Sequence, residues 1–236
     1  MRRLIVNADD FGYSRGVNRG IAEAHERGIV TSASLMVNRA AAAEAAEYGR
    51  DHEELGVGLH VDLRHWRVRR RPWSLVWSAG QLRRLVASEV CRQLERFRAL
   101  LGRDPTHLDS HHHRHRQAPI RPIFEAVAQE LDVPLRHLDS RITFCGDFYG
   151  HDGAGKPDPA SITPAALVAL LEKLPDGVVE LGCHPGYADD LDTWYRNERV
   201  QEVEALCDPA VRETIDRLGI ELISFGTVAE ARPVKP

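Results

Sequence analysis

Residues 4–10 read Leu4-Ile5-Val6-Asn7-Ala8-Asp9-Asp10, a short apolar run that ends in two adjacent aspartates. A run of this length predicts a buried β-strand, here over Leu4–Asn7. The segment from Val17 to Arg27 has helical character and is followed by Gly28, a residue that often ends a helix. The start of the chain therefore predicts a strand followed by a helix, the unit from which parallel sheets are built.

The same alternation continues to the end of the chain. Further strands are expected at residues 33–37, 57–59, 135–138, 178–182 and 221–224, and another begins at Leu108 and runs into the histidine cluster. Helices are expected at residues 40–50, 81–101, 120–131, 164–174, 198–206 and 209–218. The segment 144–159, rich in glycine, aspartate and proline, is expected to form a long loop. Six or seven such units indicate one barrel-like α/β domain that spans residues 1–236.

The composition is that of a soluble globular protein. The 236 residues are 43% hydrophobic and 28% charged, and the net charge of -4 offers no global attraction to nucleic acid or to an anionic membrane. The aspartates end the first apolar run too early for a signal peptide, and no later stretch is long enough to span a bilayer. Cys91, Cys145, Cys183 and Cys207 form no CxxC pair. We therefore expect a cytoplasmic protein with no nucleic-acid or membrane partner, and the sequence leaves homo-oligomer formation open.

Polar groups follow four strand-like runs directly: Asp9-Asp10, His60, His111–His113 and His184. The carboxyl ends of parallel strands meet on one face of the fold, so these groups are expected to share a pocket. Any one of them alone has a plainer explanation, such as a solvated turn, a buried structural histidine or a surface cluster. Four groups that can bind a metal, each at the end of a predicted strand, are harder to explain by chance than any one of them.

Two imidazoles and a carboxylate suit a divalent cation and leave positions open for water and substrate. Asp10, His60 and His111 are the expected ligands of one metal ion, with zinc or magnesium favoured over manganese or cobalt. Asp9 could then accept a proton from the attacking water, and His184 could protonate a departing amine. The sequence thus predicts a metal-dependent hydrolase.

Residues 64–80 interrupt the pattern with many arginines and three tryptophans, and are expected to cross the surface. Trp66 could pack against the C–H face of a sugar ring, and the arginines could pair with a phosphate or a carboxylate. The alternative is a solvated basic loop. His113, His115 and Arg141 are the other expected substrate contacts.

Several motifs resemble the YdjC-like carbohydrate deacetylases, the group that includes chitooligosaccharide deacetylase. They are Leu4–Gly12, Gly28–Ser32, Gly58–His60, Pro105–His113 and Cys183–Gly186. The resemblance implies a distorted, partly open (β/α) barrel, similar to a TIM barrel, that removes the acetyl group from an N-acetylated sugar. It implies the same metal ligands, Asp9 as the base, and an arginine near the site, for which Arg136 and Arg141 are both candidates.

The arginine-rich segment departs from the family pattern, so a chitobiose-type substrate does not follow, and an anionic or phosphorylated N-acetyl sugar is the hypothesis to test. Two alternatives remain open. One is a different metal hydrolase that acts on phosphoesters or non-sugar amides, although such barrel enzymes commonly carry His-x-His where this chain has Asp9-Asp10. The other is a catalytically silent protein that binds sugar or metal.

Overall fold

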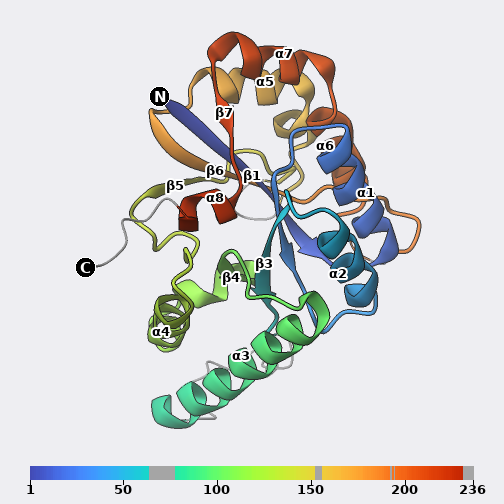
Figure 1. The fold of residues 1–236 in the computed structure, drawn as a ribbon. Helices are drawn as coiled ribbons and strands as arrows, with labels where there is room; N and C mark the ends of the chain where they lie inside the picture. The colour runs from blue at the N-terminus through green and yellow to red at the C-terminus, as the bar shows by residue number, and fades with distance from the viewer. Residues whose placement is uncertain (64–77, 152–155, 192, 194, 231–236) are drawn as a thin grey trace.

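The sheet is built entirely from parallel strands. The computed structural model describes residues 1–63, 78–151, 156–191, 193 and 195–230. Its strands are β1 (Arg2–Phe11), β2 (Ser32–Leu35), β3 (Gly56–Val61), β4 (Leu108–Ser110), β5 (Ile142–Cys145), β6 (Gly177–Cys183) and β7 (Glu221–Leu222). Their order is β4-β3-β2-β1-β6-β5, with β7 paired to the first residues of β1 (Figure 1). The long strand β1 therefore lies at the centre of the sheet.

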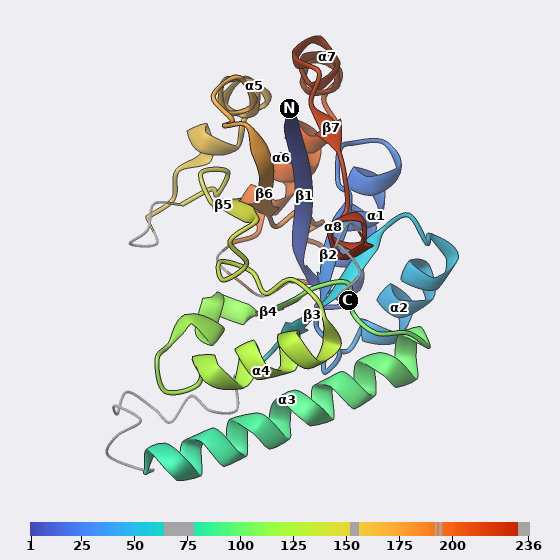
Figure 2. The ribbon, with the colours of Figure 1, turned by 60° about the vertical axis from the view of Figure 1, so that its left-hand side comes forward.

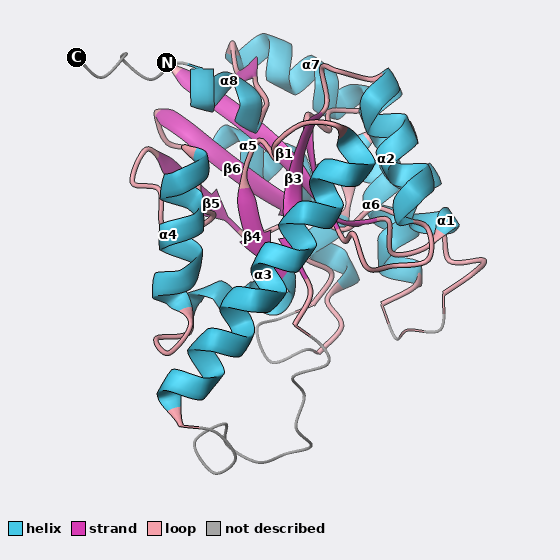
Figure 3. Ribbon diagram, turned by 60° about the horizontal axis from the view of Figure 1, so that its bottom comes forward, coloured by secondary structure: helices cyan, strands magenta, loops and turns pink. Residues whose placement is uncertain are grey.

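Helices form a layer on the outside of this curved sheet (Figures 2 and 3). They are α1 (Arg15–Glu26), α2 (Ala42–Asp51), α3 (Ala79–Leu101), α4 (Arg121–Leu131), α5 (Pro164–Glu172), α6 (Asn197–Leu206) and α7 (Pro209–Leu218). The short helix α8 (Phe225–Glu230) lies instead against the inner face, where Phe225 and Val228 pack with Ile5. Neighbouring helices touch in the order α4-α3-α2-α1-α6-α5-α7, which follows the order of the strands. No pairing joins β4 to β5 in the described part of the chain. The expected distorted, partly open (β/α) barrel is confirmed.

The two faces of each strand differ in chemistry. On β1, Leu4 and Val6 pack into the large apolar core beneath the helices, whereas Ile5 belongs to a smaller cluster with residues of α8. Alternate residues of a strand point to opposite faces, so Asn7 and Asp9 share the inner face with Ile5. The inner face is thus apolar at the start of β1 and polar near its carboxyl end.

Most predicted elements are present with small shifts at their ends. β1 extends beyond Asn7 to Phe11 and so includes both aspartates. Residues 135–138 form no strand, because only Leu135 bridges to Leu108 and the left-handed φ of +63° at His137 turns the chain away. The prediction also missed β5, which is four residues long and pairs with β6 alone, and the short helix α8. Residues 64–77, with Trp66, lie outside the described part of the chain.

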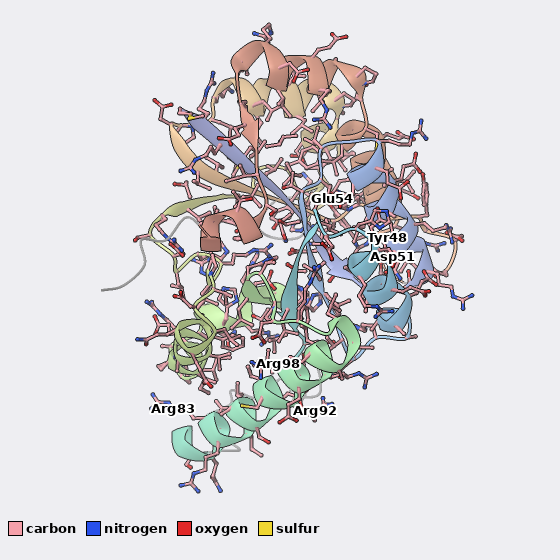
Figure 4. All side chains as sticks on the ribbon, viewed as in Figure 1. Tyr48, Asp51, Glu54, Arg83, Arg92 and Arg98 are labelled. Carbon is pink, nitrogen blue, oxygen red and sulfur yellow. The ribbon has the colours of Figure 1, made fainter. Side chains whose placement is uncertain are left out.

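The basic residues of α3 lie away from the inner face of the sheet. Figure 4 labels three of its arginines. Arg83 donates to the carbonyl of Pro119, and Arg92 and Arg98 pair with Glu89 and Asp104. These contacts are exposed and therefore contribute little to stability.

Within the described residues, no helix has the length and apolar character needed to cross a membrane.

Helix α1 approaches the loop after β6 so closely that a side chain would not fit between them. A Cβ atom at Gly20 would lie 2.4 Å from Cα of Gly186. We expect Gly20→Ala to lower the free energy of unfolding by about 1–3 kcal/mol, because either α1 or the loop must shift. Urea unfolding followed by circular dichroism measures this change.

Gly80→Ala in α3 is the matched control, since a Cβ there meets no atom within 4 Å. It should leave stability unchanged or raise it slightly, because alanine favours a helix. Equal stability of Gly20→Ala and the wild type would show that the α1 contact is not tight in solution.

Candidate active site

A cavity of about 410 Å³ lies at the carboxyl ends of the strands. The residues that line it are Asp9, Asp10, Tyr13, His60, His111, His112, His113, Tyr149, His151, His184, Thr193, Tyr195 and Arg199. All four polar groups that follow strand-like runs in the sequence meet here. The prediction that they share one pocket is confirmed.

An extra residue in β1 brings both aspartates into this cavity. Ala8 pairs with Ala33 and Phe11 with Leu35, so three steps along β1 match two steps along β2. Asp10 takes up the difference with a left-handed φ of +68°, a conformation that few non-glycine residues adopt. Two consecutive residues of a regular strand would point to opposite faces. The bulge instead lets Asp9 and Asp10 line the same wall.

Asp10, His60 and His111 present their ligand atoms to one another. One ligand atom from each residue lies within 4.8 Å of the others. Oδ1 of Asp10 lies 3.2 Å from Nδ1 of His111 and 3.8 Å from Nε2 of His60. This oxygen is buried and accepts no hydrogen bond from the described residues. A buried carboxylate oxygen without a donor is costly, and a cation held by the three residues would satisfy it.

A neighbouring carboxylate orients one of these ligands, His60. Nδ1 of His60 donates to Oδ1 of Asp109 at 2.8 Å, which leaves Nε2 directed at Asp10. Metal-binding histidines are commonly held by a carboxylate in this way. Burial alone would lower the pKa of His60, but the carboxylates of Asp109, Asp9 and Asp10 raise it to about 9. The pocket therefore attracts positive charge, and its donors fit a divalent cation.

Arg136 neutralises the acidic groups beneath the cavity. Its guanidinium is fully buried and pairs with Asp9 at 2.7 Å, with Asp109 at 2.6 Å and with Glu180 at 2.6 Å. Burial raises the pKa of Asp9, but Arg136 and His60 outweigh it and lower the pKa below its usual value. Asp9 is therefore ionised at neutral pH and accepts hydrogen bonds rather than donating them.

His184 also lies close to Asp9. Its Nε2 lies 3.8 Å from Oδ2 of Asp9, and its ring is 5.0 Å from the ring of Tyr149 between centroids. Burial lowers the pKa of His184 to about 4, so the imidazole is neutral at pH 7. Its Nδ1 finds no hydrogen-bond partner among the described residues. A neutral histidine next to an ionised aspartate can take part in proton transfer.

The histidine cluster divides into exposed and buried members. His112 and His113 have left-handed φ values of 56° and 51°, and these turn their side chains toward the cavity. His113 packs against His137 at 4.8 Å between ring centroids. His115 is fully buried, with its ring between the Ser110 hydroxyl and the carbonyl of Arg136. It does not line the cavity, so the prediction that His115 contacts substrate is wrong.

The structure also distinguishes the two arginines that the sequence left open. Arg141 pairs with Asp139 at 2.7 Å and borders a different surface hollow, so its prediction as a substrate contact is wrong. Arg136 is the arginine that contacts Asp9. The two lie only five residues apart, and the sequence around them does not show that Arg136 is buried while Arg141 is partly exposed.

Sequence reasoning missed several lining residues. Tyr149 and His151 come from the segment predicted as a loop, and Tyr195 and Arg199 come from the region at and before α6. None directly follows a predicted strand. Arginine and tyrosine are also common on surfaces, so their type gave no signal. α6 buries Arg199 and Glu202, but a single sequence does not show which face of this helix is buried.

The family model described as YdjC-like protein matches residues 3–217. A carbohydrate deacetylase of Geobacillus stearothermophilus is 38% identical over an alignment that covers 95% of this chain and 97% of that protein. A chitooligosaccharide deacetylase of Yersinia enterocolitica is 34% identical, with 94% and 97% covered. The similarity thus extends over nearly the full length of both relatives.

Solved structures give the same fold. A protein of Enterococcus faecalis, for which cleavage of cellobiose phosphate is suggested, superposes with a TM-score of 0.78 at 26% identity and covers 96% of this chain and 98% of that one. A family 4 carbohydrate esterase of Streptomyces lividans superposes with a TM-score of 0.55 at 15% identity, with 94% and 91% covered. The second likeness concerns the fold alone.

Replacing Arg136 tests how strongly the buried acids depend on it. Arg136→Met leaves Asp9, Asp109 and Glu180 without their shared cation, and we expect the free energy of unfolding at pH 7 to fall by about 3–5 kcal/mol. Arg136 lowers the pKa of Asp9 and Asp109, so the stability it supplies is present at neutral pH and lost as pH falls. The difference from the wild type should narrow as the pH falls below about 4, the ordinary pKa of an aspartate.

Arg141→Met is the matched control, because it makes the same substitution in the partly exposed ion pair of Arg141 with Asp139. It should change the free energy of unfolding by at most about 1 kcal/mol, with a correspondingly smaller dependence on pH, because Arg141 lowers the pKa of the partly exposed Asp139 only. Similar losses in the two variants would contradict the structural role given to Arg136.

Proposed function

Because this chain belongs to the family of YdjC-like proteins, we propose that it is a carbohydrate deacetylase that hydrolyses the acetamido group of an N-acetylated sugar. The observation that carries the proposal is the unsatisfied oxygen of Asp10 between His60 and His111, directly beside the ionised Asp9. Open metal sites of this kind serve hydrolysis, whereas closed ones serve structure.

Asp10, His60 and His111 would hold one divalent cation. When bound, the cation supplies Lewis acidity: it polarises the acetyl carbonyl and makes water more acidic. Zinc and magnesium are the favoured ions, and manganese or cobalt would fit the same donors. Asp109 fixes the imidazole of His60 through its Nδ1, and Arg199 contacts the second oxygen of Asp10. These contacts keep Nε2 of His60 and Oδ1 of Asp10 available.

Asp9 and His184 would move the protons. The salt bridge to Arg136 holds Asp9 ionised and in place, so its free lone pairs can accept a proton from the attacking water. The imidazole of His184 is neutral, so it must itself be protonated before it can protonate an amine. Its Nε2 lies 3.8 Å from Oδ2 of Asp9, a distance that a small movement closes. The proton would then pass from water through Asp9 and His184 to the nitrogen of the departing amine, leaving acetate and a free amino sugar.

Aromatic side chains would bind the sugar. Tyr13, Tyr149 and Tyr195 line the cavity together with His113. Tyrosine rings pack well against the C–H faces of sugars. Trp66 stays a prediction, because it lies outside the described residues.

The finer substrate proposal is an anionic or phosphorylated N-acetyl sugar. Its support is the arginine-rich stretch of the sequence between residues 64 and 71 and the similarity to the Enterococcus protein for which cleavage of a sugar phosphate is suggested. Arginine recognises phosphate through paired hydrogen bonds. A neutral oligosaccharide is the competing choice, in keeping with the chitooligosaccharide deacetylases among the relatives.

The proposed activity can be measured as acetate release from neutral N-acetylated sugars and their phosphorylated counterparts. The protein is first stripped with a chelator and then reloaded with zinc, magnesium, manganese or cobalt. We expect release only after reloading, and with higher kcat/KM for the phosphorylated sugars. Equal kcat/KM for both sets would refute the preference for phosphate. Stoichiometric metal without any release would favour another metal hydrolase or a silent binding protein.

Two variants separate the proton acceptor from the metal ligands. Asp9→Asn should keep the metal, because Asp9 is not among its ligands, but lower kcat by about 10²–10⁴-fold through loss of the base. His111→Ala removes a ligand and should abolish both metal binding and turnover. Metal content by mass spectrometry and acetate release by a coupled assay measure the two effects. Wild-type turnover in Asp9→Asn would exclude Asp9 as the base.

A further inference from the structure

Helix α6 buries two ionisable side chains beside the cavity, and one of them, Arg199, lines it. Arg199 and Glu202 are one turn apart and are 6% and 0% exposed. Residues three apart lie on the same side of a helix, so the pair forms one unit. Burying both charges has a free-energy cost that is offset only by specific partners. Those partners identify what the pair does.

Both backbone polar groups of His184 are bound by this pair. The N–H of His184 donates to Oε2 of Glu202, and its carbonyl oxygen accepts from the guanidinium of Arg199 at 3.2 Å. The imidazole has no such support, because its Nδ1 is without a partner among the described residues. A catalytic histidine is usually oriented by a hydrogen bond to its second ring nitrogen. Here the orientation comes through the backbone.

The same two side chains reach the rest of the site. Arg199 donates to Oδ2 of Asp10 at 2.5 Å. Glu202 accepts from the hydroxyl of Tyr195 at 2.5 Å, and that hydroxyl accepts from the N–H of Gly150 at 2.8 Å. One turn of α6 therefore joins three separate segments: the end of β1, the start of the loop after β6, and the segment that carries Tyr149 and His151.

We propose that Arg199 and Glu202 are positioning residues that set where His184 stands relative to Asp9 and Asp10. Arg199 bonds to both His184 and Asp10 and so fixes their separation. Glu202 bonds to His184 but not to Asp10. It also accepts a hydrogen bond from Tyr195, one of the tyrosines that line the cavity. The inference rests on the proposed function, in which His184 delivers a proton. Neither side chain is required to touch the sugar.

Glu202→Ala is the main test, and Glu204→Ala is its control, since Glu204 is an exposed glutamate on the same helix. We expect Glu202→Ala to lower kcat by about 10- to 100-fold, as misplacement of a catalytic group does. KM and the affinity for the metal should change little, because Glu202 contacts none of Asp10, His60 or His111. Glu202→Gln should recover much of the loss, because its amide oxygen still accepts the His184 N–H. Glu204→Ala should match the wild type.

Arg199→Lys tests the other half of the pair while keeping its charge. A lysine has a single nitrogen in place of the two guanidinium nitrogens that bond His184 and Asp10, so we expect a lower kcat together with a metal affinity weakened by about 10-fold. Isothermal titration with zinc alone measures the affinity without any substrate. Unchanged zinc affinity in Arg199→Lys would overturn its link to Asp10.

Amide exchange at His184, followed by ¹H–¹⁵N NMR, gives a readout that does not depend on turnover. Exchange should accelerate at this amide in Glu202→Ala but not in Glu204→Ala. If the wild type releases acetate from no sugar, the proposed function fails while this exchange still tests the backbone contact. A kcat in Glu202→Ala within threefold of the wild type, or an equal loss in Glu204→Ala, would overturn the positioning role.

Discussion

The salt bridges of Arg136 are the interaction on which the rest of the structure depends. Three carboxylates, from β1, β4 and β6, converge on the inner face of the sheet and meet this one guanidinium. Without it, these strands would bring like charges together in a place that water does not reach, which is prohibitively costly. Arg136 follows the bridge between Leu135 and β4, so it enters the open side of the barrel. The side chain of Arg136 and its three carboxylate partners thus fill the interior, a place that apolar side chains fill in most barrels.

Above this layer, the site is assembled from parts with different origins. Asp9 and His60 occupy regular inward positions of β1 and β3, and they would face the interior of any barrel with this register. Asp10 reaches the cavity only because β1 contains an extra residue. His111 follows β4 directly, and Arg199 and Glu202 come from a helix of the outer layer. The strands therefore determine where the site lies, and the bulge in β1 and the side chains from α6 complete it.

The same distinction explains how much of the molecule could be predicted from the sequence. Residues that follow apolar runs, such as His60 and His184, were assigned correctly to one pocket, because parallel strands bring their ends together whatever the details. The bulge at Asp10 has no pattern of its own, and the sequence does not show which of Arg136 and Arg141 is buried. His115 belongs to the same run as His111, yet its ring fills an internal space below the cavity. Long-range packing decided these cases, and a single sequence does not display it.

The extra residue in β1 sets the orientation of the second aspartate separately from that of the first, although the two are neighbours in the sequence. Deletion of one residue at the bulge would restore regular pairing with β2 and turn the second carboxylate away from the cavity. The first carboxylate would keep its buried partner, and the barrel would keep its internal charge balance. A descendant of this kind would fold and could still bind sugars while lacking a ligand for the metal. The loss of chemistry in such a lineage would be visible as a gap of one position in an alignment rather than as a substitution.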